Sequence, residues 1–156
     1  MGAWGIKALE SDAGLDVIDF LEDFYESRTT LLLSEIITTF IGEGFLGKNR
    51  DQIDFYFDNT TIVLVELYLM FQENGALNYD HENKNISLRK KTAFVSDLTS
   101  LESLFQSLTD IKNERPDKDG EREYVELWKD SSSYEEWKAH LENLIIELKK
   151  AIKLKK

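Results

Sequence analysis

The sequence predicts a mainly α-helical fold, a single-domain bundle of about five to six helices over residues 1–156. Four segments carry apolar side chains at alternating three- and four-residue spacing, which is the period of an amphipathic helix. Only residues 76–95 show the shorter alternation that is typical of strands. With 42% hydrophobic residues and a single proline, the chain can also bury a core of its own.

The first helix is expected over residues 12–27, with Ser11 or Asp12 as its N-cap. The side chains expected to face the core are Val17, Ile18, Leu21, Phe24 and Tyr25. Acidic residues recur on the opposite face at helical spacing: Asp12, Asp16, Asp19, Asp23 and Glu26. Burial of the apolar face turns this acidic line outward, where it is either a solvated surface or a docking face for a basic partner.

Two apolar segments follow the first helix. TTLLLSEIITTF predicts a second helix that ends at Gly42. TTIVLVELYLMFQEN is apolar nearly all round and is followed by Gly75, so we expect a helix at the centre of the fold. Its β-branched start is also compatible with a buried strand, but its length favours a helix. Residues 76–95 form either a short β-hairpin or a long loop.

The last third of the chain predicts two further helices. One covers the apolar stripe of residues 98–111, with Thr99 and Glu102 at capping-box spacing. The polar segment NERPDKDGER is expected to be a solvated linker, since it holds the only proline and an Asp-Gly turn. The final helix is expected to begin at a second capping box, made by Ser133 and Glu136. Lysines gather at its carboxyl end, where positive charge offsets the helix dipole.

Composition excludes several classes of function. The net charge of −11 would repel nucleic acid over most of the surface. The absence of cysteine excludes disulfides and thiolate sites, and it suits a reducing cytoplasm. The longest apolar run is interrupted by Glu66 and is too short to span a membrane, and no secretory signal opens the chain. We therefore expect a cytoplasmic protein with no nucleic-acid or membrane partner, and its oligomeric state stays open.

Motifs of catalysis or cofactor binding lack the context that their chemistry needs. The run GEGFLG at residues 42–47 matches the dinucleotide spacing GxGxxG, but it follows an amphipathic helix rather than a strand. We interpret it as a helix-terminating loop. His81 and His140 lie outside known metal-binding spacings, although Glu136 and His140 share a helix face. We predict no metal site, no cofactor and no catalytic residue.

The chain begins with MGAWG, in which the indole of Trp4 lies between Gly2 and Gly5. The glycines would let the backbone bend tightly around an indole that packs against the helical core. Gly2, Trp4 and Gly5 are thus predicted to be a structural anchor. The alternative is that Trp4 is an exposed recognition residue.

The stretch MGAWG followed by ESDAGLDVIDFL resembles the start of a bacterial family catalogued as domain of unknown function 4259. The matching positions are Gly2, Trp4, Gly5, Glu10, Asp12, Leu15 and Asp16. Ile6 and Lys7 depart from the residues that usually follow Trp-Gly in that family. The resemblance implies a small intracellular bacterial protein, and it brings no catalytic residues with it.

These observations favour a binding function. A small acidic domain can mask a basic protein, as immunity proteins and some regulatory domains do, and its charge would speed their association. The competing hypothesis is a metal-dependent enzyme that uses the carboxylates of the first helix. The sequence offers that enzyme neither a nucleophile nor a well-placed base, so binding is favoured over catalysis.

Overall fold

The computed structural model of the chain describes residues 3–77 and 86–156. Within these residues the fold is mainly α-helical, as predicted, and its helices of ten residues or more are α1 (Asp12–Phe24), α2 (Leu33–Gly42), α3 (Phe55–Asn74), α5 (Leu98–Lys112) and α7 (Tyr134–Lys155). Shorter elements lie between them: the 3-10 helix η1 (Ala8–Glu10), α4 (Ile86–Arg89) and α6 (Glu123–Lys129).

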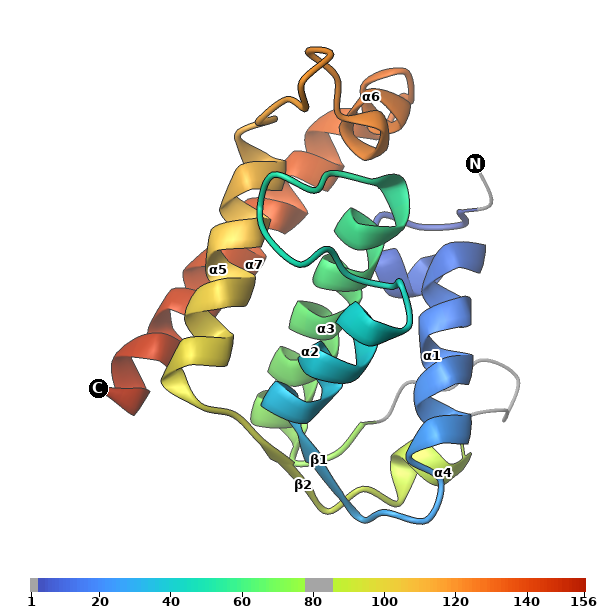
Figure 1. The fold of residues 1–156 in the computed structure, drawn as a ribbon, viewed down its shortest axis with the longest axis vertical. Helices are drawn as coiled ribbons and strands as arrows, with labels where there is room; N and C mark the ends of the chain where they lie inside the picture. Colours follow the sequence, from blue (N-terminus) through green and yellow to red (C-terminus); the bar gives the residue numbers. More distant parts are fainter. Residues whose placement is uncertain (1–2, 78–85) are drawn as a thin grey trace.

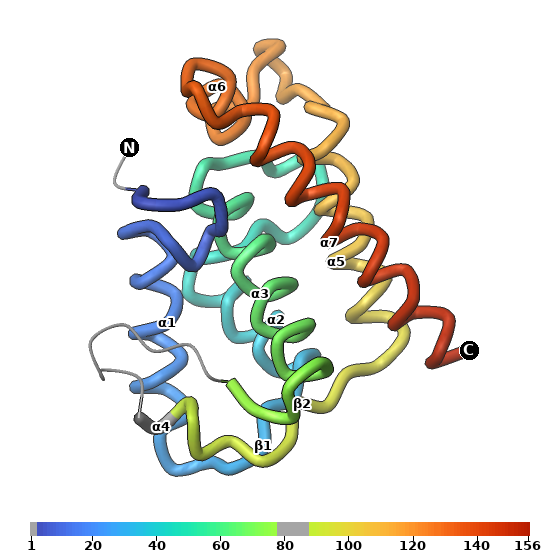
Figure 2. Tube along the Cα trace, turned by 180° about the vertical axis from the view of Figure 1, so that it is seen from behind, coloured from blue at the N-terminus to red at the C-terminus, as the bar shows by residue number. Residues whose placement is uncertain are grey.

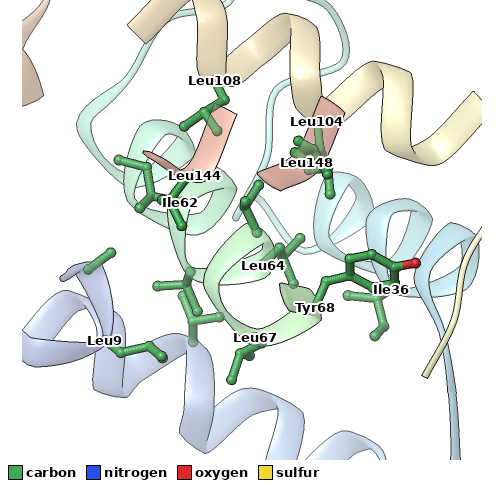
Figure 3. Packing of buried hydrophobic residues seen from close by; sticks show 14 of the residues in the cluster. Leu9, Ile36, Ile62, Leu64, Leu67, Tyr68, Leu104, Leu108, Leu144 and Leu148 are labelled. Carbon is green, nitrogen blue, oxygen red and sulfur yellow. The ribbon is translucent and has the colours of Figure 1, made fainter. Parts of the chain in front are cut away.

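The apolar helix α3 occupies the centre of the bundle, which confirms the expectation of a central helix rather than a strand (Figures 1 and 2). Every residue from 58 to 68 is buried, because η1, α1, α5, α6 and α7 all pack against α3. Figure 3 shows Leu64 and Leu67 of α3 among side chains that come from several of these elements. One hydrophobic cluster therefore runs from Ala8 to Ile152.

A two-stranded parallel sheet closes one end of the bundle. Strand β1 (Thr30–Leu32) pairs with β2 (Ala93–Val95), and Leu31 lies opposite Phe94. The hairpin considered for residues 76–95 has its middle, residues 78–85, outside the described part of the chain. The strand that does form there pairs with a distant segment, since β1 lies between α1 and α2.

The ends of α1 differ in part from the prediction. Ser11 is the N-cap, and its hydroxyl accepts a hydrogen bond from the Gly14 N–H at 3.0 Å. The helix ends at Phe24, before the expected residue 27, because the chain turns there towards β1. Phe24 was expected in the core and is instead 53% exposed, stacked on Phe20, whereas Tyr25 is buried as expected.

Aspartates cap two of the later helices, and at α5 the aspartate takes the place of the expected capping box. Asp54 accepts a hydrogen bond from the Tyr56 N–H, so α3 begins earlier than the apolar run suggested. Asp97 caps α5 by accepting from the Ser100 N–H, in place of the Thr99 and Glu102 box. Ser133 precedes α7 as predicted, but its side chain makes no capping bond. The start was predicted to within a residue for α1, α5 and α7. It was wrong for α3, which begins at Phe55, and for the second helix, whose expected first residues form β1 so that α2 begins only at Leu33.

The glycine run at residues 42–47 is a helix-terminating loop, in agreement with the sequence interpretation. Gly42 ends α2, and Gly44 adopts a φ of 82°, in the left-handed region that glycine tolerates. The next helix begins only at Phe55, so these glycines do not open a helix as a dinucleotide site requires. Among the described residues, none of the helices is both long enough and apolar enough to cross a membrane.

Candidate functional site

The acidic line of α1 is exposed in the structure. Asp12, Asp16, Asp19 and Asp23 lie on the solvent side of the helix, and Glu26 follows in the turn after it. The opposite side is buried through Val17, Ile18 and Leu21. Within the described residues, none of the five carboxylates forms an ion pair or a side-chain hydrogen bond. We call these five residues the acidic face. At one end of it, the charge of Glu26 acts through space on the ammonium group of Lys91.

Trp4 does not pack in the core, and this corrects the anchor prediction for its side chain. The indole is 49% exposed, and it borders a surface hollow with Ile6, Trp128 and Glu136. Gly5 lies directly against the carboxyl group of Glu10, where an added Cβ would come within 2.5 Å of Cδ. Gly2 lies outside the described residues. The anchor role of Gly2 and Gly5 stays a prediction.

The start of the chain is held by its backbone and by the residues that follow Trp4. Ala3 pairs with Ser11 in an antiparallel bridge, and the Trp4 N–H donates to the Glu10 carbonyl at 2.9 Å. Ala8 and Leu9 are buried. Gly14 of α1 approaches the Ala8 carbonyl so closely that a Cβ would lie 1.9 Å from its oxygen, so the helix needs glycine there.

A buried carboxylate, Glu66 of α3, receives this N-terminal segment. Its two oxygens accept hydrogen bonds from the backbone N–H groups of Ala8 and Leu9, each at 3.0 Å. The ring Nε2 of His140 in α7 lies 2.6 Å from Glu66 Oε2. Glu66 is only 6% exposed, so it needs these partners to offset the loss of water. One carboxylate thus joins η1, α3 and α7.

Sequence reasoning missed this contact. It noted Glu66 only as a break in an apolar run, and it compared His140 with Glu136 on the same helix. The useful signal was the charge itself, because a carboxylate in a helix that is apolar all round must find a partner elsewhere. That partner is 74 residues away along the chain.

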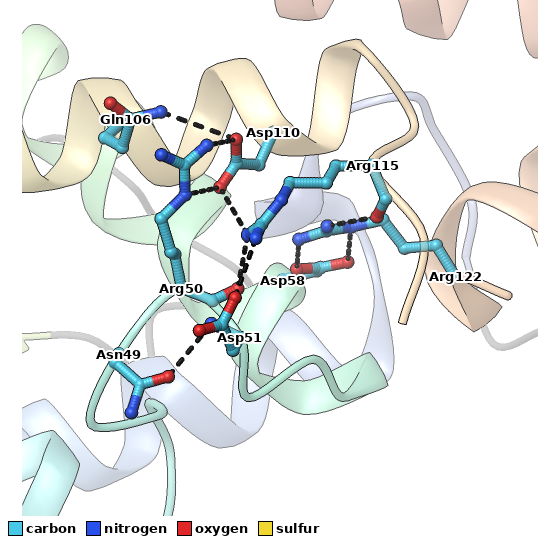
Figure 4. Close-up of polar contacts among 8 residues, drawn as sticks. All are labelled: Asn49, Arg50, Asp51, Asp58, Gln106, Asp110, Arg115 and Arg122. Carbon is cyan, nitrogen blue, oxygen red and sulfur yellow. Dashed lines mark hydrogen bonds and ion pairs between the residues drawn. The ribbon is translucent and has the colours of Figure 1, made fainter. Parts of the chain in front are cut away.

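A second polar cluster joins the loop after α2 to α5 and to the segment before α6 (Figure 4). Arg122 donates two hydrogen bonds to Asp58, from Nε at 2.8 Å and from Nη2 at 2.7 Å. Arg50 makes the same forked contact with Asp110, at 3.1 and 2.6 Å. Arg115 bridges Asp51, at 2.7 Å, to the Arg50 carbonyl, at 3.0 Å.

This Arg/Asp cluster is partly dry. Asp58, Asp110 and Arg122 are each about nineteen-twentieths buried, at 4%, 5% and 6% exposure. Burial raises the pKa of the Asp58 carboxyl, and the hydrogen bonds from Arg122 oppose that shift. A cavity of about 390 Å³ opens beside the cluster, between the loop after α2 and α5. Of the charged groups that line the cavity, Arg50 pairs with Asp110 and Arg122 pairs with Asp58, and Lys48 is the remaining one. The cluster is therefore a clamp between elements rather than a set of free ligands.

The metal-site hypothesis has no support in residues 3–77 and 86–156. Within them, no three side chains of His, Asp and Glu come together as a group that could hold a metal ion. His81 lies outside the described residues. The metal-dependent enzyme considered from the sequence therefore gains nothing from the placement of the acidic face.

These features define a small acidic helical domain with a buried Arg/Asp clamp and an acidic face that has no ion pair within residues 3–77 and 86–156. Residues 2–140 match the family model described as a domain of unknown function (DUF4259), and the chain belongs to that family. The match extends from the first residues through most of the bundle and ends within α7. Comparisons with curated proteins and with solved structures gave no match.

Proposed function

We propose that this chain is a binding protein whose acidic face docks a basic protein partner, in the manner of an immunity or regulatory domain. The observation that carries the proposal is that the acidic face forms no ion pair with any residue that the structure describes. Elsewhere in the described chain, many carboxylates are paired, such as Asp51, Glu35 and Glu114 at the surface and Asp58 and Asp110 inside.

The acidic face has an energetic cost in the free protein. Carboxylates about one helical turn apart repel each other by a few tenths of a kcal/mol per pair. Only the first of them, Asp12, lies in the first turn of α1, where the helix dipole compensates. A basic partner would remove this repulsion and would be steered to the face from a distance.

The test is capture of partners on the immobilised protein from a lysate of its source organism at low salt. A triple reversal, Asp16→Lys, Asp19→Lys and Asp23→Lys, should abolish capture of basic proteins and slow their association. The matched control reverses three exposed acids on α3, α5 and α7: Glu73→Lys, Glu102→Lys and Glu142→Lys. It changes the net charge equally and should keep binding.

The second part of the experiment measures how partner binding depends on salt concentration. Binding through exposed charge should weaken steeply as salt shortens the screening length below about 10 Å. A partner whose affinity ignores both salt and the triple reversal would show that the acidic face is only a solvated surface. Equal loss in the triple reversal and in its control would reduce the effect to net charge and would also contradict the proposal.

A further inference from the structure

We propose that a hollow beside the acidic face is a binding site for an arginine side chain of the basic partner. This inference rests on the proposed function and gives that surface a specific anchor point. The hollow has a volume of about 270 Å³ and lies between α1, the turn after α2 and the first turns of α3. Its wall includes Asp16, so it adjoins the acidic face.

The charge of the hollow is negative. Asp16 from α1 and Glu43 from the turn after α2 both line it, and both are exposed. Within the described residues neither carboxylate has an ion pair, and no lysine or arginine lines the hollow. A cation in the hollow would therefore meet two free carboxylates.

The other walls of the hollow suit the flat group and the aliphatic stem of arginine. Val17 and Phe45 give apolar surface for the stem. Tyr56, at the start of α3, is 55% exposed and offers an aromatic face. A guanidinium group stacks on aromatic faces, and its several N–H groups can donate hydrogen bonds to a carboxylate and a carbonyl at the same time. Lysine has a compact, strongly hydrated charge that gains less from this wall.

The side chain of Asn59 is an independent observation that points to a ligand. Its side chain is fully buried, at 0% exposure, and within the described residues neither its amide oxygen nor its amide nitrogen has a hydrogen-bond partner. Buried amides in folded proteins are rarely left in this state, because the lost hydrogen bonds to water must be replaced. Asn59 contributes to the wall of the hollow, although its amide atoms have almost no accessible surface. A rotation of this side chain would bring its oxygen to an arginine that enters, where it could accept a hydrogen bond.

Asn59 also lines a cavity of about 30 Å³, together with Tyr124 and Trp128. That volume suits a single water molecule, which is the competing partner for the amide. A water partner and an arginine partner for Asn59 can be distinguished by one measurement. Only an arginine site makes the Asn59 amide respond to a cation added from solution.

The probe is N-acetyl-arginine amide, titrated into the ¹⁵N-labelled protein and followed by NMR, with N-acetyl-citrulline amide as the neutral control of the same shape. We expect saturable shifts at the Gly44 backbone and at the Asn59 side-chain NH₂, with a Kd on the order of 1 mM. N-acetyl-lysine amide should bind at least about fivefold more weakly, since it cannot stack and fork in the same way.

Two exposed positions allow variants that leave the core intact. Asp16→Asn and Tyr56→Ala should each weaken binding of the arginine probe about fivefold or more. Asp23→Asn is the matched control, because it removes the same charge from the same helix about 10 Å further along the axis. It should change the Kd less than twofold.

Several outcomes would overturn the arginine site. These are shifts spread evenly along α1, equal binding of citrulline or lysine, equal effects of Asp16→Asn and Asp23→Asn, or an Asn59 amide that does not respond. Any of them can occur while the Asp-to-Lys triple reversal still abolishes partner capture, in which case the proposed function stands without this anchor. If partner capture survives the triple reversal while the arginine probe binds as expected, the docking proposal fails and the hollow remains a ligand site.

Discussion

Aspartates occur in two opposite settings in this molecule. Asp58 and Asp110 are buried and are each held by the fork of an arginine, Arg122 and Arg50 respectively. Asp16 and Asp23 on α1 are exposed and, within the described residues, unpaired. The side chain is the same, and only the surroundings differ.

The difference shows what each group of charges can do. A charge removed from water must be paired and hydrogen-bonded, so Asp58 and Asp110 are committed to holding the fold together. An exposed charge contributes little to stability and keeps its field available to a partner. The Arg/Asp clamp therefore belongs to folding, and the acidic face is the surface proposed for binding.

The largest effect is expected from breaking the clamp. Asp58→Ala would leave the Arg122 guanidinium buried without its carboxylate and should lower the free energy of unfolding by about 3–5 kcal/mol. Urea denaturation measures this loss. The double variant Asp58→Leu, Arg122→Met should recover much of it, since no charge is then left buried. If the Asp58→Ala variant loses less than about 1 kcal/mol, the Asp58–Arg122 ion pair is accessible to water rather than buried.

Glu66 is a second buried carboxylate that needs its hydrogen-bond partners, which here are in the N-terminal segment. Glu66→Gln keeps the shape but replaces one acceptor oxygen by an NH₂ group that faces a backbone N–H, so about 2–3 kcal/mol of stability should be lost. Hydrogen exchange at the Ala8 and Leu9 amides should speed up as well. Glu142→Gln, at an exposed position of α7, is the control and should be nearly neutral. Unchanged exchange at both amides would argue against the contact.

Glu114 tests a paired carboxylate nearer the surface. Burial alone would raise its pKa, but contacts from Lys129, Tyr134 and Lys138 outweigh burial and lower the pKa to about 2, from 4.5 for the free group. This stabilisation is fully present above pH 4.5 and is lost as the pH falls towards 2.

The expected advantage of the native protein over Glu114→Gln is about 1–2 kcal/mol at pH 7, allowing for screening by solvent. Urea denaturation at several pH values should show that more than half of this advantage has gone by about pH 3. A difference between the two proteins that does not vary with pH would mean that the contacts act through packing rather than charge.

Two tryptophans give the same comparison for apolar side chains. Trp137 is 1% exposed and stacks on Trp128, so Trp137→Ala should cost about 3–5 kcal/mol. Trp4 is half exposed, and Trp4→Ala should cost only about 1 kcal/mol. Thermal or urea unfolding of both variants decides the question. If the Trp4 variant were as unstable as the Trp137 variant, the prediction that Trp4 is a buried anchor would be supported after all.

The smallest effect is expected on the acidic face itself. Asp16→Asn, Asp19→Asn and Asp23→Asn together should raise stability by a few tenths of a kcal/mol at low salt, because repulsion between neighbouring charges is relieved. The gain should disappear at high salt. Destabilisation by more than about 1 kcal/mol would reveal a structural role for these carboxylates.

The sequence by itself determined the features that depend on neighbours along the chain. The 3.6-residue period gave the helices and the outward direction of the acidic face, and a segment that is apolar on every side predicted the central α3. The glycines at the ends of α2 and α3 predicted where these helices end, because helix termination depends on residues that are close in the sequence. The first residues also indicated the family, which the match over residues 2–140 confirms.

Only the tertiary structure decided which distant groups meet. Asp58 and Arg122 are separated by 64 residues, and Glu66 and His140 by 74, so no local period relates them. β1 and β2 likewise pair although α2, α3 and α4 lie between them in the chain. The exposure of Trp4 was also undetermined, because five residues cannot show whether a neighbouring surface is close enough to cover an indole. Such contacts depend on how whole helices pack, and packing is a property of the complete chain.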